Sequence, residues 1–159
     1  MNSYTTSFTV DRSPAETFEA INNPRGWWAA NIEGVTNQAG EEFTHEVKDV
    51  HYAKMRITEL VPGELVVWRV VDGRVSFVAD PDEWTGTEMR FELTENIGRT
   101  EVRFTHQGLI PDHECYDACS NAWGLYVAGS LRNLITTGAG NPNSNPDETR
   151  YQEQTQTTT

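Results

Sequence analysis

The residues best able to do chemistry are two histidines that sit among apolar residues in strand-like segments. His106 shares a strand face with Phe104, and His45 shares one with Phe43, because residues two apart project from the same side of a strand. Both rings are therefore expected to point inward, whereas His51 lies near an element end and is expected to be solvated. An inward imidazole could orient a ligand or act as an acid or base. Alternatively, a backbone carbonyl or a neighbouring side chain could satisfy it, which is the commoner outcome for an isolated buried histidine.

The five tryptophans form a second candidate group. They could line an aromatic cavity for a small molecule or simply pack the core, and the sequence favours neither interpretation. Trp123 lies on an apolar helical stripe, whereas the inward face around Trp68 is ambiguous because apolar residues flank it on both sides. The residues predicted to contact a ligand are Trp27, Trp28, His45, Met55, Trp68, Met89, Phe91, Phe104, His106, Trp123, Tyr126 and Val127.

Motifs for cofactor, metal and nucleophilic chemistry are missing from the sequence. It contains no glycine-rich phosphate loop, no Gly-x-Ser-x-Gly elbow and no His-Glu-x-x-His motif. Cys115, Cys119 and His113 lie close together, but a zinc site needs a fourth ligand, so we interpret the cysteines as reduced thiols. Arg69 could reach a ligand carboxylate, although a solvent-facing ion pair is the expected role. We predict no cofactor, no metal site and no catalytic residue.

The charge of the chain limits its partners. Acidic residues outnumber basic residues 24 to 12, which gives a net charge of −12. This excludes nucleic acid, because phosphate binding requires a basic face, and it disfavours an anionic membrane surface. The first residues do not resemble a secretion signal, and no apolar run is long enough to span a membrane. We expect a cytoplasmic protein without membrane insertion, either a monomer or a homodimer.

Two short helices are expected directly after the first strand. Residues 4–10 alternate between polar and apolar side chains, as a strand with one buried face does. Ser13 is a good N-cap, Pro14 suits the first helical position, and Glu16 completes a capping box. A second short helix or turn follows and carries a Trp-Trp pair.

A run of antiparallel strands fills the middle of the chain. Alternating apolar residues predict strands near 43–47, 52–60, 65–71, 75–78, 87–93 and 101–106. Asp72-Gly73 is a signal for a two-residue hairpin turn. A helical stripe then predicts one long helix, with Asp112 as its N-cap. Residues 1–137 are predicted to form one domain, and residues 138–159 a disordered polar tail.

Three segments resemble those of a known family: SPAETF at 13–18, TEVRFTHQGL at 100–109, and Trp123 followed by two leucines. Together with the order of elements, they resemble the helix-grip fold of the START-like superfamily, and more closely the branch homologous to the activator of the ninety-kilodalton heat-shock protein's ATPase. The resemblance implies an α+β fold in which a curved antiparallel sheet of six to seven strands wraps a long C-terminal helix, with two short helices after the first strand. In that fold Trp27 and Trp28 would lie near the mouth of a cavity between sheet and helix.

Three functions stay open, because this fold serves several kinds of protein. The first is binding of a small hydrophobic or amphipathic ligand in the cavity between the sheet and the C-terminal helix. The second is a chaperone-linked protein-interaction module, which the acidic charge favours by steering a basic partner. The third is a cofactor-free cyclase, dehydratase or hydrolase that uses His45 or His106, and the missing His–carboxylate dyad makes it the weakest. We therefore expect a binding protein more than an enzyme.

Overall fold

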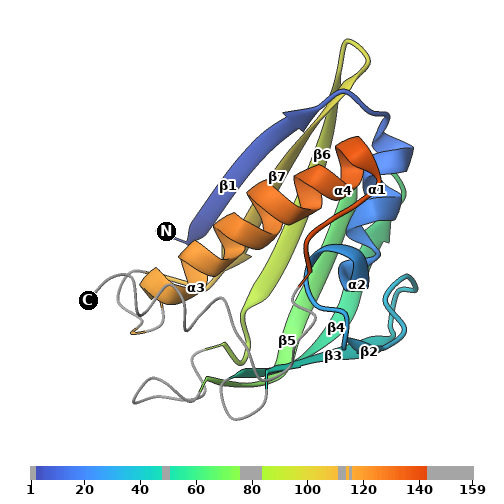
Figure 1. Ribbon diagram of the computed structural model, residues 1–159. Helices are drawn as coiled ribbons and strands as arrows, with labels where there is room; N and C mark the ends of the chain where they lie inside the picture. Colours follow the sequence, from blue (N-terminus) through green and yellow to red (C-terminus); the bar gives the residue numbers. More distant parts are fainter. Residues whose placement is uncertain (1–2, 48–50, 76–83, 111–113, 115, 143–159) are drawn as a thin grey trace.

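One curved antiparallel sheet is the framework of the molecule (Figure 1). The structure is a computed structural model that describes residues 3–47, 51–75, 84–110, 114 and 116–142. Within these ranges seven strands pair in the order β1-β7-β6-β5-β4-β3-β2, so the first and last strands of the chain are neighbours. The strands are β1 (Tyr4–Val10), β2 (Glu33–Gly34), β3 (Glu42–Val47), β4 (His51–Val61), β5 (Leu65–Val75), β6 (Glu88–Asn96) and β7 (Arg99–Gln107).

The strand β7 shows why these segments form a sheet with one buried face. Its even-numbered residues from Thr100 to His106 are buried, whereas the charged residues between them are exposed. The antiparallel neighbour β6 places Phe91 opposite Phe104 on the same face. Residues of alternating polarity therefore turn one aromatic face of the sheet toward a common interior.

Two short helices follow β1, as the sequence predicts. The helix α1 spans Pro14–Ile21 and begins with the expected capping box. The Glu16 amide donates to the Ser13 hydroxyl, and the Glu16 carboxylate accepts a hydrogen bond from the Ser13 amide. The helix α2 spans Pro24–Trp27 and leads directly into Trp28.

One long helical run crosses the inner face of the sheet (Figure 1). It consists of α3 (Tyr116–Trp123), the π-helix η1 (Gly124–Leu131) and α4 (Arg132–Thr137). The expected N-cap, Asp112, lies outside the described residues. The π-helical middle differs from the continuous α-helix that the apolar stripe predicts. Such wide turns are rare and occur frequently at functional sites.

These elements confirm the predicted α+β helix-grip fold. A curved antiparallel sheet, two short helices after its first strand and a long C-terminal helix occur in the expected order. Within the described ranges, none of the helices has both the length and the apolar character needed to pass through a bilayer.

The strand β5 corrects the predicted hairpin at Asp72-Gly73. The strand runs on through both residues and stays paired with β4. A register shift makes Val71 the extra residue of a β-bulge. A Cβ at Gly73 would lie 3.2 Å from the Trp84 side chain, so the glycine permits a close approach inside a strand instead of a turn. The rest of the predicted return strand, 76–78, lies outside the described residues.

The chain folds back on itself after α4, which ends at a glycine in the left-handed conformation. The Asn141 amide donates to the Ser130 hydroxyl over 2.6 Å. Gly140 passes so close to the Gly26 carbonyl that a Cβ at this position would clash with it. The first residues of the predicted tail therefore pack against the domain. The remainder, 143–159, lies outside the described residues, and its disorder stays a prediction.

Candidate functional site

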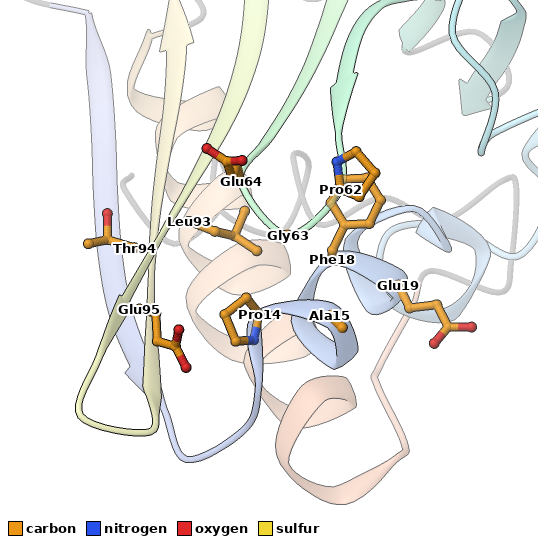
Figure 2. A pocket seen from close by; sticks show the side chains of 10 residues that line it. All are labelled: Pro14, Ala15, Phe18, Glu19, Pro62, Gly63, Glu64, Leu93, Thr94 and Glu95. Atoms are coloured by element: carbon orange, nitrogen blue, oxygen red, sulfur yellow. The ribbon is translucent and has the colours of Figure 1, made fainter.

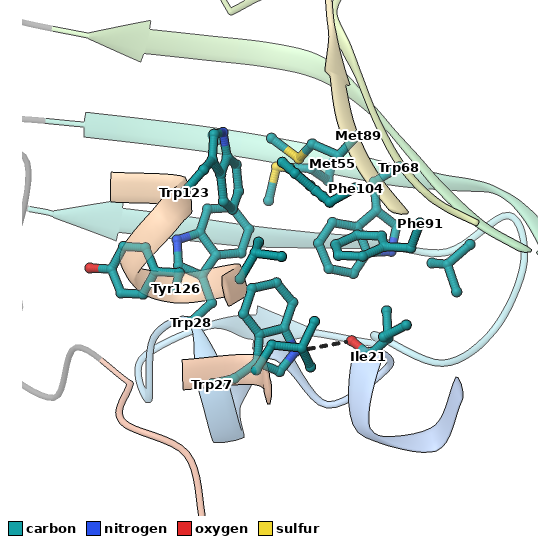
Figure 3. Close-up of a cluster of buried hydrophobic side chains, with 14 of the residues drawn as sticks. Ile21, Trp27, Trp28, Met55, Trp68, Met89, Phe91, Phe104, Trp123 and Tyr126 are labelled. Atoms are coloured by element: carbon teal, nitrogen blue, oxygen red, sulfur yellow. Dashed lines mark hydrogen bonds between the residues drawn. The ribbon is translucent and has the colours of Figure 1, made fainter. Parts of the chain in front are cut away.

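All of the predicted ligand-binding residues lie in one interior between the sheet and the C-terminal helix, and Figure 3 shows most of the apolar ones. They come from α2 and its C-terminal end, from the strands β3 to β7, and from α3 and η1. Each of them is fully buried. Strand and helix periodicity therefore located the interior correctly, while the role of these residues as ligand contacts stays a prediction.

Three stacked indole rings form the centre of this interior. Trp68 lies nearly parallel to Trp27 and to Trp28, with ring centroids 6.2 Å apart in both pairs and interplanar angles of 12° and 8°. The ambiguous face around Trp68 is thus the inner one. Trp27 and Trp28 lie at the centre instead of at a mouth, because α2 turns inward and the Trp27 indole donates to the Ile21 carbonyl (Figure 3).

His106 has hydrogen bonds at both ring nitrogens. Its Nδ1 lies 2.9 Å from Trp123 Nε1, and its Nε2 lies 2.8 Å from Thr87 Oγ1. An indole nitrogen can only donate, so Nδ1 accepts and the proton of the neutral ring is on Nε2. Nε2 then donates to Thr87, whose hydroxyl donates to the Trp84 carbonyl over 2.6 Å. His106 is therefore satisfied by neighbouring side chains and joins the C-terminal helix to the sheet.

His45 has the opposite surroundings. Its fully buried ring stacks on Trp28 with 4.3 Å between centroids. Neither ring nitrogen has a hydrogen-bond partner in the described part of the chain. Burial lowers the pKa of His45 to about 3, so the ring is neutral at physiological pH. A neutral imidazole has one hydrogen-bond donor and one acceptor. In His45 both are buried without a partner among the described residues.

Three indole N–H groups are buried in the same condition. The Nε1 atoms of Trp28, Trp68 and Trp84 have no acceptor among the residues that the structure describes. Asn22 Oδ1, at the end of α1, likewise has no donor among them. Buried polar groups in folded proteins almost always find a partner, and leaving one unpaired costs about 1–3 kcal/mol. The interior therefore contains hydrogen-bonding capacity that the described chain does not use.

Two of these residues, His45 and Trp84, lie at one end of the interior together with His51 and His106. We call this end the polar end and define it by these four residues. Their rings follow one another in series. The centroid distances are 5.3 Å from His45 to His51, 4.2 Å from His51 to Trp84, and 4.7 Å from Trp84 to His106. Residues that are distant in the sequence thus form one continuous wall of imidazole and indole rings.

The burial of His51 corrects the expectation that it is solvated. It is the first inward position of β4 and alternates with the buried Ala53 and Met55. Extending the alternation of β4 backwards by one step would have found it. Burial, together with repulsion from His45 and His106, holds the pKa of His51 well below its usual value.

The interior holds no Asp, Glu, Lys or Arg side chain in the part of the chain that the structure describes. On the outer face, Glu42 pairs with Arg56 at 2.8 Å and with Lys54 at 3.3 Å, and these hydrogen bonds lower the pKa of Glu42. Arg69 lies 3.9 Å from Glu88, which is the solvent-facing ion pair expected for it. The strands therefore separate uncharged polar groups inside from charged groups outside.

No cluster of three or more His, Cys, Asp or Glu side chains in the described ranges could hold a metal ion. Cys119 is buried in α3, while Cys115 and His113 lie outside those ranges. The described polar end consists of neutral rings that can donate or accept hydrogen bonds.

A groove of about 670 Å³ opens at the other end of the sheet (Figure 2). It lies between α1, the turn from β4 to β5, and the end of β6. Its apolar lining residues include Pro14, Phe18, Pro62 and Leu93, and its acidic ones are Glu19, Glu64 and Glu95. Sequence reasoning missed this groove, because its residues come from three separate segments and no local motif joins them.

Comparison with known proteins gives a family and a fold. Residues 11–136 match the family described as "Activator of Hsp90 ATPase homolog 1-like protein". A comparison with curated proteins found no match.

Several solved structures are similar to this chain. The Aha1 dimer from Colwellia psychrerythraea is 22% identical, with a TM-score of 0.71 over 88% of this chain and 100% of that chain. Protein MLL2253 from Mesorhizobium loti is 16% identical, with a TM-score of 0.64 over 83% and 96% of the two chains. DynU16, from the dynemicin biosynthetic locus, is 13% identical, with a TM-score of 0.65 over 88% and 49%. At these identities the likeness shows the fold.

The buried neutral His45 predicts a specific loss of stability in acid. An unfolded histidine binds a proton near pH 6.5, but folded His45 does so only near pH 3, so stability falls as the pH drops through that window. The contribution is about 2 kcal/mol between pH 7.5 and 5.0. In His45→Phe, the free energy of unfolding should fall less between these two pH values, by this amount. Urea unfolding followed by far-UV circular dichroism measures the difference. Ile57→Val, a core control that keeps every histidine, should retain the wild-type pH dependence of stability. If His45→Phe also retained the wild-type pH dependence, the pKa assigned to His45 would be contradicted.

Hydrogen bonds run from Trp123 through His106 and Thr87 to the Trp84 carbonyl, and we call this series the relay. It predicts the effect of removing the Thr87 hydroxyl group. Thr87→Val leaves the His106 Nε2–H without its acceptor in nearly the same volume, so the free energy of unfolding should fall by about 1–3 kcal/mol. Thr94→Val removes an exposed hydroxyl from β6 and should change stability by less than about 0.5 kcal/mol. Chemical denaturation compares the two variants, and equal stabilities would show that the relay has no energetic role.

Proposed function

The chain belongs to the Activator of Hsp90 ATPase homolog 1-like family, and on this premise we propose that it binds a small hydrophobic or amphipathic molecule between its sheet and its C-terminal helix. The molecule contacts the ring-lined interior that α2, the strands β3 to β7, α3 and η1 form together. Because one fold hosts many functions, the support for this proposal comes from the chain's own interior.

The unpaired polar groups are the observation that carries the proposal. Trp28, His45, Trp68 and Trp84 each have a buried nitrogen without a partner among the described residues. At about 1–3 kcal/mol for each group, the summed penalty is comparable with the 5–15 kcal/mol net stability of a typical domain. A molecule that pairs these groups offsets the penalty, whereas core packing alone gives no reason for them.

The π-helical segment supplies a point of entry. η1 covers the interior with Tyr126 and Val127 and contains Gly124 and Gly129. A Cβ would fit at both glycines, with its nearest neighbours 3.8 Å and 4.0 Å away. Packing therefore does not require glycine at either position, yet each glycine weakens a helix by about 1 kcal/mol relative to alanine. We therefore expect this segment to separate from the sheet more readily than the rest of the helix.

Binding fits this interior better than catalysis does. A histidine that acts as an acid or base usually works with a group that orients it, and no carboxylate is buried in the described part of the chain. The low pKa of His45 also makes it a weak base at neutral pH. In the proposed function, the protein therefore binds its ligand without transforming it.

A matched pair of variants in η1 tests the proposal. The wild-type protein should bind the neutral apolar probe N-phenyl-1-naphthylamine saturably. Val127→Phe fills the interior side of η1 and should weaken binding by about tenfold or more, whereas Leu125→Phe on the exposed side should leave it unchanged. Far-UV circular dichroism checks that both variants fold. Non-saturable probe binding, or equal binding by the two variants, would contradict the proposal.

The groove favours a second candidate function, docking of a protein partner. Its apolar lining includes Phe18 and Leu93, and its described lining also contains three glutamates but no basic residue. The nearby turn after β6 carries Ile97, which is 96% exposed. These features complement a segment that presents an apolar side chain beside lysine or arginine. The family's description names activation of the Hsp90 ATPase, so an Hsp90-type chaperone is the partner to test.

Charge neutralisation at the groove distinguishes specific docking from general attraction. The test variant changes the three groove glutamates to glutamine: Glu19, Glu64 and Glu95. The matched control changes three exposed glutamates at the β2–β3 edge to glutamine: Glu33, Glu41 and Glu46. Both variants alter net charge equally, but only the first should weaken binding to a bacterial Hsp90-type chaperone, by about tenfold in sedimentation experiments. No binding by the wild-type protein, or equal losses in both variants, would contradict docking at the groove.

A further inference from the structure

We propose that the molecule bound in the interior is neutral and planar, and that its carbonyl-type acceptor atoms face the polar end. This inference rests on the proposed ligand-binding function and specifies the chemistry of the ligand. It follows from three properties of the described interior: the kind of hydrogen-bonding group left unpaired, the missing charge, and the arrangement of the rings.

The unpaired groups are mainly donors. Trp28, Trp68 and Trp84 each present an indole N–H, which can donate but cannot accept. His45 adds one donor and one acceptor, because its ring is neutral. A complementary ligand must therefore offer acceptor atoms, as carbonyl, quinone, lactone or ether oxygens do. A ligand rich in N–H or O–H groups would leave the indoles unpaired.

The lack of a buried Asp, Glu, Lys or Arg among the described residues makes an ionic ligand unfavourable. No lysine, arginine, aspartate or glutamate is buried in the described residues, so a carboxylate or an ammonium group would enter without a counter-ion. Burying an unpaired ion is strongly unfavourable, and several uncharged N–H donors do not replace full hydration. The same polar end can hold a neutral oxygen acceptor, which loses far less hydration on burial.

The ring geometry favours a flat molecule. Trp27, Trp28 and Trp68 are nearly parallel, and His45 continues the stack on Trp28 with an interplanar angle of 23°. Aromatic rings pack well in such offset-stacked layers. A planar body can therefore lie against the indole faces while its acceptor reaches the adjoining polar end. The parallel indoles thus select the planar body of the ligand, and the polar end selects its acceptor atom.

Three related probes separate these requirements. Fluorene supplies the planar body alone, 9-fluorenone adds one carbonyl acceptor, and fluorenone-2-carboxylate adds a negative charge. Equilibrium dialysis against the full chain should give a Kd for fluorenone at least tenfold lower than for fluorene. The carboxylate should bind at least tenfold more weakly than fluorenone. Fluorenone binding no tighter than fluorene binding, or carboxylate binding as tight as fluorenone binding, would overturn the inference.

Variants at the polar end assign the preference to named donors. His45→Phe and Trp84→Phe keep aromatic rings but remove the unpaired nitrogens, so each should reduce the preference for fluorenone over fluorene by at least threefold. Ile57→Val, a core substitution that removes no donor, should keep the wild-type preference. An unchanged preference in both polar-end variants would overturn the assignment.

The same measurements distinguish failure of this inference from failure of the proposed function. If neither fluorene nor fluorenone binds saturably, the proposed ligand-binding function fails and this inference fails with it. If both bind with equal affinity, the interior binds ligands, but the neutral acceptor is not what it recognises.

Discussion

The indole of Trp123 donates a hydrogen bond across the interior to His106, and the rest of the domain is arranged around that contact. Because the indole can only donate, the imidazole must present Nδ1 as its acceptor and donate from Nε2 to Thr87. One tautomer thereby joins α3, β7 and the segment before β6. Trp84 completes the junction, with its ring edge-on to His106 at 87°. These hydrogen bonds therefore favour the helix position that keeps Trp123 Nε1 within reach of His106.

Satisfied and unsatisfied polar groups lie within a few ångströms of one another in the same interior. His106 uses both of its nitrogens, whereas His45 uses neither within the described residues. A domain can retain such groups when apolar burial supplies enough stability elsewhere. Each buried tryptophan removes about 150–250 Å² from water, which stabilises the fold by roughly 4–6 kcal/mol as an upper limit. The dense aromatic core therefore offsets the cost of leaving His45 and Trp84 without hydrogen-bond partners among the described residues.

Most of the fold could be predicted from local patterns. Period-two alternation located the strands, and the capping box at Ser13 located α1, because both signals depend on neighbouring residues alone. The hairpin predicted at Asp72-Gly73 was wrong, since pairing with β4 and the nearby Trp84 side chain decide the conformation there. The π-helical turns of η1 were also missed, because helical periodicity does not distinguish an α-turn from a single wider one.

The sequence predicted which residues form the candidate site, but not their hydrogen bonds. Alternation placed His45 and His106 inward correctly. Only the fold shows that Trp123 and Thr87 pair with His106, while His45 has no hydrogen-bond partner among the described residues. The burial of His51 depends on where β4 begins, which is an element boundary and hence a weak sequence signal. The groove near α1 gave no signal in the sequence, since its apolar and acidic lining residues meet only in three dimensions.

The near-parallel packing of Trp27, Trp28 and Trp68 has an optical consequence. Indole chromophores whose centroids are 6.2 Å apart couple their electronic transitions, and the coupling depends on the angles between the rings. All five tryptophans are buried, so surface indoles add no background to the absorption of polarised light near 280 nm. The near-UV circular dichroism of the protein should therefore change whenever these rings move relative to one another.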